Sequence, residues 1–164
     1  MIEIIKTDIT KLEVDAIVNA ANQSLLGGGG VDGAIHKAAG KSLLEECKKI
    51  GGCPTGEARI TGAYNLPAKH VIHTVGPVYK DGKRGEAALL KSAYLSSLKL
   101  ATLNGIESLA FPNISTGVYA YPLREAAIIA ITTVKDYMQK NELPSKVYFV
   151  CFNKANFYLY NQLI

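Results

Sequence analysis

The 164-residue sequence has few cysteines, no long apolar run and no segment in which basic and aromatic residues alternate. Its cysteines, Cys47, Cys53 and Cys151, are odd in number and form no C-x-x-C pair. This pattern favours reduced thiols over disulfides or a zinc site. No apolar stretch is long enough to span a membrane, and the first residues do not resemble a secretory or transit signal. We therefore expect a cytoplasmic protein.

Signatures of nucleophilic catalysis and of nucleotide hydrolysis are also missing. No Ser-His-Asp or Cys-His arrangement predicts a nucleophile, so any chemistry should use an activated water. Lys41-Ser42 follows Gly40 as in a phosphate-binding P-loop, but that motif needs a glycine where Ile35 stands and a strand leading into it. We therefore reject a P-loop nucleotide hydrolase.

Dinucleotide and metal sites find equally little support. Gly28, Gly30 and Gly33 formally match G-x-G-x-x-G, but no acidic residue ends a second strand at the expected distance. His70 and His73 flank a predicted strand and have no metal-ligand spacing to each other or to the cysteines, so we interpret them as structural. We expect neither a metal nor a cofactor.

The composition is that of a globular domain with a preference for anions. Hydrophobic residues make up 48% and charged residues 20% of the chain, and the net charge is +4. The length favours a single domain over residues 1–164, and nothing requires more than a monomer. A mild positive charge favours anionic ligands, whereas a nucleic-acid-binding face is not expected.

Apolar patterning predicts strands that alternate with helices. The expected strands are residues 2–5, 15–19, 58–66, 71–75, 109–111 and 147–152. The expected helices are residues 31–39, 43–50, 86–103, a segment from about 122, and 156–163. This alternation predicts an α/β fold with helices on both faces of a largely parallel sheet.

Four consecutive glycines, Gly27 to Gly30, lie directly before the predicted helix Val31 to Ala39. Without a Cβ atom, such a loop can adopt positive φ and turn its N–H groups toward a ligand. The N–H groups of the loop and of the helix N-terminus together form an anion site. The glycine loop, residues 27–30, therefore predicts phosphate binding.

Polar side chains surround the glycine loop. Asn19 and Asn22 end a predicted strand, at the edge where open α/β sheets bind ligands. Asp32 stands in the first helical turn, either beside the place where an anion would bind or only as a complement to the helix dipole. His36 follows one turn later on the same helical face and can pair with Asp32.

A second loop joins the predicted strand 109–111 to the helix that starts near Pro122. It consists of Ser115, Thr116, Gly117, Val118 and Tyr119. Taken alone it is either a tight turn or a phosphate site, but two such strand-to-helix loops favour a diphosphate ligand. Tyr119 and Tyr121 either contact a sugar or anchor the loop.

Two further positions have two interpretations each. Asp8 either caps a short turn or accepts a hydrogen bond from the exocyclic amine of a purine. Phe152, at the end of the last predicted strand, either joins the core, which the pattern slightly favours, or stacks on a base.

These motifs resemble the macrodomain family, and within it the MacroD-type branch. The resemblance is carried by N-A-A-N at Asn19 to Asn22 and by G-G-G-G-V-D-G-A-I-H at Gly27 to His36, and it extends over nearly the whole chain. T-D-I-T at Thr7 to Thr10 is similar to the family's G-D-I-T, with Thr7 in place of the usual glycine. The resemblance implies a three-layer α/β/α sandwich with a mixed, mostly parallel six-stranded sheet.

Macrodomains bind ADP-ribose, and the resemblance implies roles for the matched residues. Asp8 would bind the adenine amine, Ile9 would line that pocket and Phe152 would stack on adenine. Asn19 would belong to the binding site. The diphosphate and the distal ribose would be held by Gly29, Gly30, Val31, Ser115, Thr116, Gly117, Val118 and Tyr119.

Asn22 and Asp32 match the pair that marks hydrolytic members, which remove mono-ADP-ribose from acidic side chains of proteins and deacetylate O-acetyl-ADP-ribose. Asn22 would fix the distal ribose, Asp32 would activate or orient a water, and His36 would hold Asp32. In a competing mechanism a substrate phosphate positions the water. A non-catalytic ADP-ribose reader is the alternative function, and the presence of both Asn22 and Asp32 favours the hydrolase.

Overall fold

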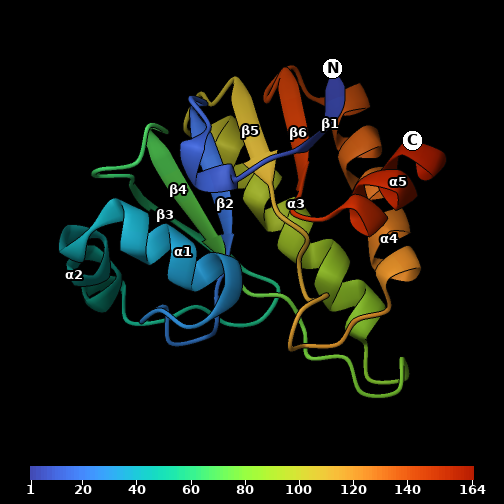
Figure 1. Ribbon diagram of the computed structural model, residues 1–164, viewed down its shortest axis with the longest axis horizontal. Helices are drawn as coiled ribbons and strands as arrows, with labels where there is room; N and C mark the ends of the chain where they lie inside the picture. Colours follow the sequence, from blue (N-terminus) through green and yellow to red (C-terminus); the bar gives the residue numbers. More distant parts are fainter.

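A computed structural model of residues 1–164 shows a six-stranded sheet between layers of helices (Figure 1). The strands are β1 (Ile2–Lys6), β2 (Ala16–Ala20), β3 (Ala58–Gly62), β4 (His70–Thr74), β5 (Ser108–Phe111) and β6 (Lys146–Cys151). They lie in the order β1-β6-β5-β2-β4-β3, and only the β3–β4 pair is antiparallel. The predicted mixed, mostly parallel sheet is confirmed.

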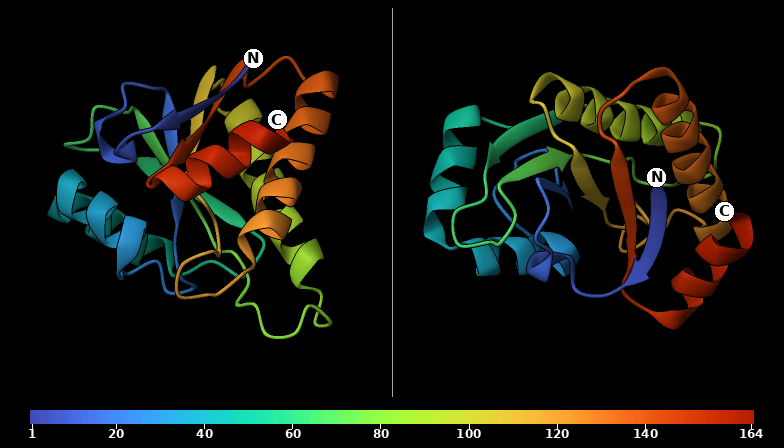
Figure 2. Two further views of the ribbon diagram at one scale, coloured as in Figure 1. Left: turned by 45° about the vertical axis from the view of Figure 1, so that its right-hand side comes forward. Right: turned by 90° about the horizontal axis from the view of Figure 1, so that it is seen from above.

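Helices cover both faces of this sheet (Figure 2). They are α1 (Gly30–Ala39), α2 (Lys41–Ile50), α3 (Glu86–Leu103), α4 (Leu123–Lys140), α5 (Lys154–Leu163) and the short 3-10 helix η1 (Ile9–Lys11). The pair α1 and α2 lies on one face and the pair α3 and α4 on the other, while α5 packs beside α4 and the edge strand β1. The predicted three-layer arrangement is therefore confirmed. No helix combines the length and the apolar character needed to cross a bilayer.

The sheet separates two apolar cores because successive side chains of a strand point to opposite faces. Phe111 and Phe149 belong to the core under α3 and α4, whereas Ile17 and Val71 belong to the core under α1 and α2. Central strands are thus buried on both faces and read as continuous apolar runs, as 16–18 does in β2. Because helices cover both faces of the sheet, we look for a site at the carboxyl ends of the strands.

Most element boundaries lie within one or two residues of the sequence-based expectation, and two of the differences have a clear local cause. The strand expected over residues 58–66 ends at Gly62, because Tyr64 adopts a left-handed φ of 54° that a strand cannot accommodate. Helix α5 begins at Lys154 rather than Asn156, since the side chain of Asn153 caps it by accepting a hydrogen bond from the Asn156 N–H.

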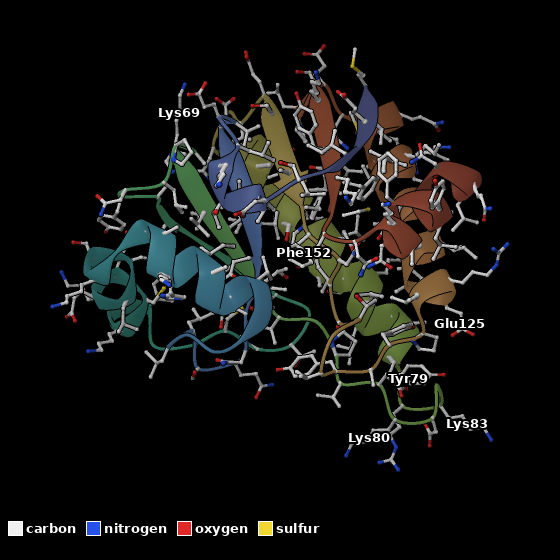
Figure 3. The ribbon with its side chains drawn as sticks, viewed as in Figure 1. Lys69, Tyr79, Lys80, Lys83, Glu125 and Phe152 are labelled. Carbon is white, nitrogen blue, oxygen red and sulfur yellow. The ribbon has the colours of Figure 1, made fainter.

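One carboxylate organises the loop between β4 and α3. Glu86, the first residue of α3, is buried and accepts backbone N–H bonds of 2.6–3.2 Å from Lys80, Asp81, Gly82 and Arg84. These bonds, first among them that from Lys80, lower the pKa of Glu86 to about 2. Tyr79, at the start of this loop (Figure 3), donates its N–H to the Tyr119 carbonyl at 2.8 Å, which supports the second loop.

We expect Glu86→Gln to remove part of the acid sensitivity of folding. Because the pKa of Glu86 falls from 4.5 to about 2 on folding, the carboxylate stabilises the protein fully above pH 4.5 and loses this effect as pH falls toward 2. The difference in thermal midpoint between the wild type and Glu86→Gln should therefore shrink steadily below pH 4.5. Glu142→Gln, at an exposed glutamate without a side-chain hydrogen bond, is the control. A difference for Glu86→Gln that stays constant down to the lowest pH would contradict this assignment.

Candidate functional site

A cavity of about 850 Å³ opens at the carboxyl ends of the parallel strands. Residues that follow β1, β2, β4, β5 and β6 all contribute to its lining. Its volume lies within the range of small-molecule sites, and its position is the one where open α/β sheets bind ligands. Both predicted loops, residues 27–30 and 115–119, contribute to its lining.

The glycine loop continues directly into α1 on one side of the cavity. Gly27 and Gly30 have φ values of 91° and 56°, a region that L side chains rarely adopt. Helix α1 starts after Gly29, which has no side chain to cap it. The N–H groups of the first turn therefore remain free to donate hydrogen bonds to a ligand. The positive end of the helix dipole thus lies at the cavity, as an anion site requires.

The second loop contributes a buried hydroxyl with no partner. Ser115 has a left-handed φ of 67°, and its Oγ atom is buried without a hydrogen bond although the residue lines the cavity. Such backbone strain costs about 1–3 kcal/mol and concentrates at functional sites. Since buried polar atoms are normally paired, this hydroxyl is suited to a polar ligand atom. Helix α4 also starts at the cavity, at Leu123, without a side-chain cap.

The two tyrosines near this loop have different surroundings. Tyr121 is buried and its ring lies 4.8 Å from that of Tyr79, so it anchors the loop. Tyr119 lines the cavity and stays partly exposed.

Asp8, Ile9 and Phe152 lie together at the cavity. Asp8 Oδ1 accepts bonds from the Thr10 hydroxyl at 2.7 Å and the Thr10 N–H at 3.0 Å, which lower the pKa of Asp8 and confirm its role as a cap. Its Oδ2 atom makes no hydrogen bond within the chain. Phe152 is 85% exposed, between α1 and α5 (Figure 3), so its interpretation as a core residue is wrong. The exposed ring is available for stacking.

Asn22 and Asp32 both line the cavity, on either side of Gly28. A Cβ atom at Gly28 would lie 3.1 Å from Asp32 Oδ2 and 3.4 Å from Asn22 Nδ2. Asn22 Oδ1 accepts two bonds from Ser24, and its Nδ2 donates to the Gly27 carbonyl at 2.9 Å. One N–H of the Asn22 amide and the Oδ2 atom of Asp32 thus make no hydrogen bond within the chain and border the same small space.

Asn19 and His36 lie behind this surface and do not line the cavity. Asn19 is fully buried and donates from Nδ2 to Asp32 Oδ1 at 2.8 Å. Asn19, which the resemblance assigns to the binding site, thus contacts Asp32 and does not line the cavity. His36 Nε2 approaches Asp32 Oδ1 at 3.5 Å across one helical turn, without forming a hydrogen bond.

The structure brings His36, Cys47 and His73 within 4.8 Å of one another, which their sequence spacing does not indicate. Both ring nitrogens of His73 are already engaged: Asn19 Nδ2 lies 3.1 Å from Nδ1 and Thr61 Oγ1 lies 2.9 Å from Nε2. Burial raises the pKa of Cys47 to about 11, so the free thiol stays protonated at neutral pH. Hydrogen bonding thus engages both nitrogens of His73, whereas His36 Nε2 has no hydrogen-bond partner.

Several cavity residues escape the sequence analysis, among them Gly76, Asn153 and Asn156. Gly76 follows β4 at the carboxyl edge, where the rule that singled out Asn19 would also have found it. A Cβ atom at Gly76 would overlap Ser115 Oγ. For Asn153 the available signal was its capping position before α5.

Comparisons with known proteins agree with the fold and the kind of site described above. Residues 18–130 match the Macro domain family. The chain is 59% identical over 167 residues to the O-acetyl-ADP-ribose deacetylase of Escherichia fergusonii, covering 99% of this chain and 94% of that protein. It is 61% identical over 153 residues to a Macro domain-containing protein of Methanosarcina mazei, covering 93% and 82% respectively.

Solved structures show the same fold with nucleotide ligands. The Oceanobacillus iheyensis macrodomain with ADP matches with a TM-score of 0.95 and 43% identity, covering 99% of this chain and 88% of that one. The Trypanosoma brucei macrodomain in complex with ADP-ribose matches with a TM-score of 0.92 and 44% identity, covering 98% and 68%.

Proposed function

Because this chain belongs to the macrodomain family, we propose that it binds ADP-ribose and hydrolyses ADP-ribosyl esters. Its substrates would be O-acetyl-ADP-ribose and the ester that links mono-ADP-ribose to aspartate or glutamate side chains of proteins. The observation that carries the proposal is the placement of Asn22 and Asp32 beside Gly28, next to two loops suited to a diphosphate. Relatives named O-acetyl-ADP-ribose deacetylase support the first substrate. The second has the same kind of bond.

The cavity offers a place for each part of ADP-ribose. Asp8 Oδ2 can accept a hydrogen bond from the adenine amine, and the exposed ring of Phe152 can stack on the base. The glycine loop, the N-terminus of α1 and the Ser115 hydroxyl suit the diphosphate. The distal ribose would then lie at Asn22, whose remaining N–H can bind a ribose hydroxyl.

Hydrolysis of such an ester consumes one water and gives a carboxylate, a ribose hydroxyl and one proton. Asp32 Oδ2, at the cavity and without a protein donor, is placed to orient that water or to take its proton. A positioned general base contributes about 10²–10⁴-fold to such a reaction. The reaction therefore needs no nucleophilic side chain.

A reader that binds ADP-ribose marks without cleaving them is the second candidate. Such a protein would use the same loops and the same adenine pocket, because these parts serve binding alone. Binding alone gives no reason for a buried carboxylate beside the cavity with one oxygen held by Asn19 and the other without a hydrogen bond, and Asp32 has this arrangement. This feature favours the hydrolase.

The test is release of free ADP-ribose from a protein mono-ADP-ribosylated on Glu or Asp, together with deacetylation of O-acetyl-ADP-ribose. Wild type should turn over both esters, whereas the double variant Asn22→Ala/Asp32→Ala should turn over neither. Calorimetric titration with ADP-ribose on the same samples measures binding separately. Tight binding without turnover of either ester would establish the reader, and absence of binding would overturn both candidates.

A further inference from the structure

Asp32 is the cavity end of a chain of buried hydrogen bonds that crosses three strands. The buried chain consists of Asp32 on α1, Asn19 on β2, His73 on β4 and Thr61 on β3, and all four side chains are buried. Asn19 Nδ2 lies 2.8 Å from Asp32 Oδ1 and 3.1 Å from His73 Nδ1. Thr61 Oγ1 lies 2.9 Å from both His73 Nε2 and the Gly62 carbonyl oxygen.

Asp32, at the cavity end of the buried chain, determines which group donates and which accepts in every bond of the chain. An ionised Asp32 can only accept, so Asn19 must turn its NH₂ group toward it. The second N–H of that group points at His73 Nδ1, which therefore accepts, and the ring proton is placed on Nε2. Nε2–H donates to Thr61 Oγ1, whose own proton goes to the Gly62 carbonyl. Each proton of the buried chain is thus assigned to one atom.

The buried chain requires a neutral His73. Burial lowers the pKa of this ring to about 3, with a further contribution from His36. A proton on Nδ1 would oppose the Asn19 amide and break the contact. The other titratable group against the ring is the Cys47 thiol, 3.9 Å from Nε2. Since Asn19 and His73 are paired neighbours in the β2–β4 register, the sheet itself fixes their contact.

We propose that His73 and Asn19 are positioning residues for Asp32. They hold Oδ1 inside the protein, and this leaves Oδ2 directed at the cavity, where the water would be oriented. The inference rests on the proposed hydrolase function. Neither residue lines the cavity, so both act through Asp32 and not through the ligand. Small displacements of a catalytic group are enough to slow a reaction severely, by about 10²-fold for 1 Å.

Two substitutions of His73 separate positioning from mere packing. His73→Leu removes the acceptor for Asn19, whereas His73→Asn places an amide oxygen near the position of Nδ1. We expect His73→Leu to lower kcat by about tenfold or more and to change the Kd for ADP-ribose by less than about threefold. We expect His73→Asn to recover most of the lost kcat. Ile72→Val is the matched control, because it loosens the same strand from the opposite face of the sheet. It should lower thermal stability and leave kcat unchanged.

Three results would overturn the proposal: a wild-type kcat in His73→Leu, no recovery in His73→Asn, or a loss of ADP-ribose affinity that parallels the loss of kcat. Inactivity of the wild type on both esters would instead contradict the proposed function.

A measurement without turnover tests the buried chain directly. The protein contains three histidines, and ¹⁵N spectra of their rings distinguish the two tautomers; signals lost in His73→Asn identify His73. We expect Nε2 protonated, Nδ1 unprotonated and no titration between about pH 5 and 8. A proton on Nδ1, or a titration midpoint within that range, would refute the buried chain whether or not the esters are cleaved.

Discussion

Asp32→Asn should lower kcat on O-acetyl-ADP-ribose by about 10²–10⁴-fold, the contribution of a positioned general base. The substitution keeps the size of the side chain, and its amide oxygen can still accept the 2.8 Å bond from Asn19. Only the charge and the basic oxygen toward the cavity are lost. The Kd for ADP-ribose should therefore change by less than about threefold. Single-turnover kinetics and calorimetric titration on one preparation give both quantities.

The same variant distinguishes the two mechanisms. If a phosphate oxygen of the substrate orients the water, Asp32→Asn should lose less than about tenfold in kcat, and the base assignment would be wrong. Asp136→Asn is the control, because Asp136 is an exposed carboxylate on α4 that does not line the cavity. It should behave like the wild type in both measurements.

Gly33→Ala should abolish most of the affinity for ADP-ribose, although Gly33 does not line the cavity. Within a helix, alanine is favoured over glycine by about 1 kcal/mol. At this position, however, a Cβ atom would lie 2.5 Å from the Gly28 carbonyl oxygen. A backbone oxygen cannot rotate away as a side chain can, so the glycine loop must move. Overpacking of this kind costs about 1–3 kcal/mol, and we expect it as a loss of both stability and binding.

Gly62→Ala is the matched control for this variant, since a Cβ atom at Gly62 would meet only side-chain atoms at 3.7 Å. Thermal unfolding and ADP-ribose titration on both variants separate the clash from a general effect of alanine. Wild-type affinity combined with a higher thermal midpoint in Gly33→Ala would show that the loop does not depend on this close approach.

Local chemistry made much of the site predictable. The glycine loop and Asp32 are close in sequence. Four glycines before a helix N-terminus expose backbone N–H groups, so the pattern alone indicates an anion site. Phe152 was harder, because an apolar residue at the end of a strand looks the same whether it faces the core or solvent. In the structure Phe152 directly precedes Asn153, the cap of α5, and is exposed.

Contacts across the sheet were beyond the reach of the sequence. Asn19 and His73 are 54 residues apart, and only the β2–β4 register makes them neighbours. For the same reason the sequence gives no sign that His73 is linked to Asp32 through Asn19. The buried position of Asn19 follows from the same pairing, because β2 is a central strand covered on both faces.

The position of β1 in the sheet has a consequence for the order in which the protein is completed. Strand β1 pairs only with β6, which lies far from it along the chain, and Lys6 is matched with Cys151. Asp8 and Phe152, which follow these two residues, therefore meet only when nearly the entire chain has folded. The place for the base therefore depends on the pairing of β1 with β6, whereas the glycine loop lies between β2 and α1. Occupancy by the nucleotide should thus report that β1 and β6 have paired.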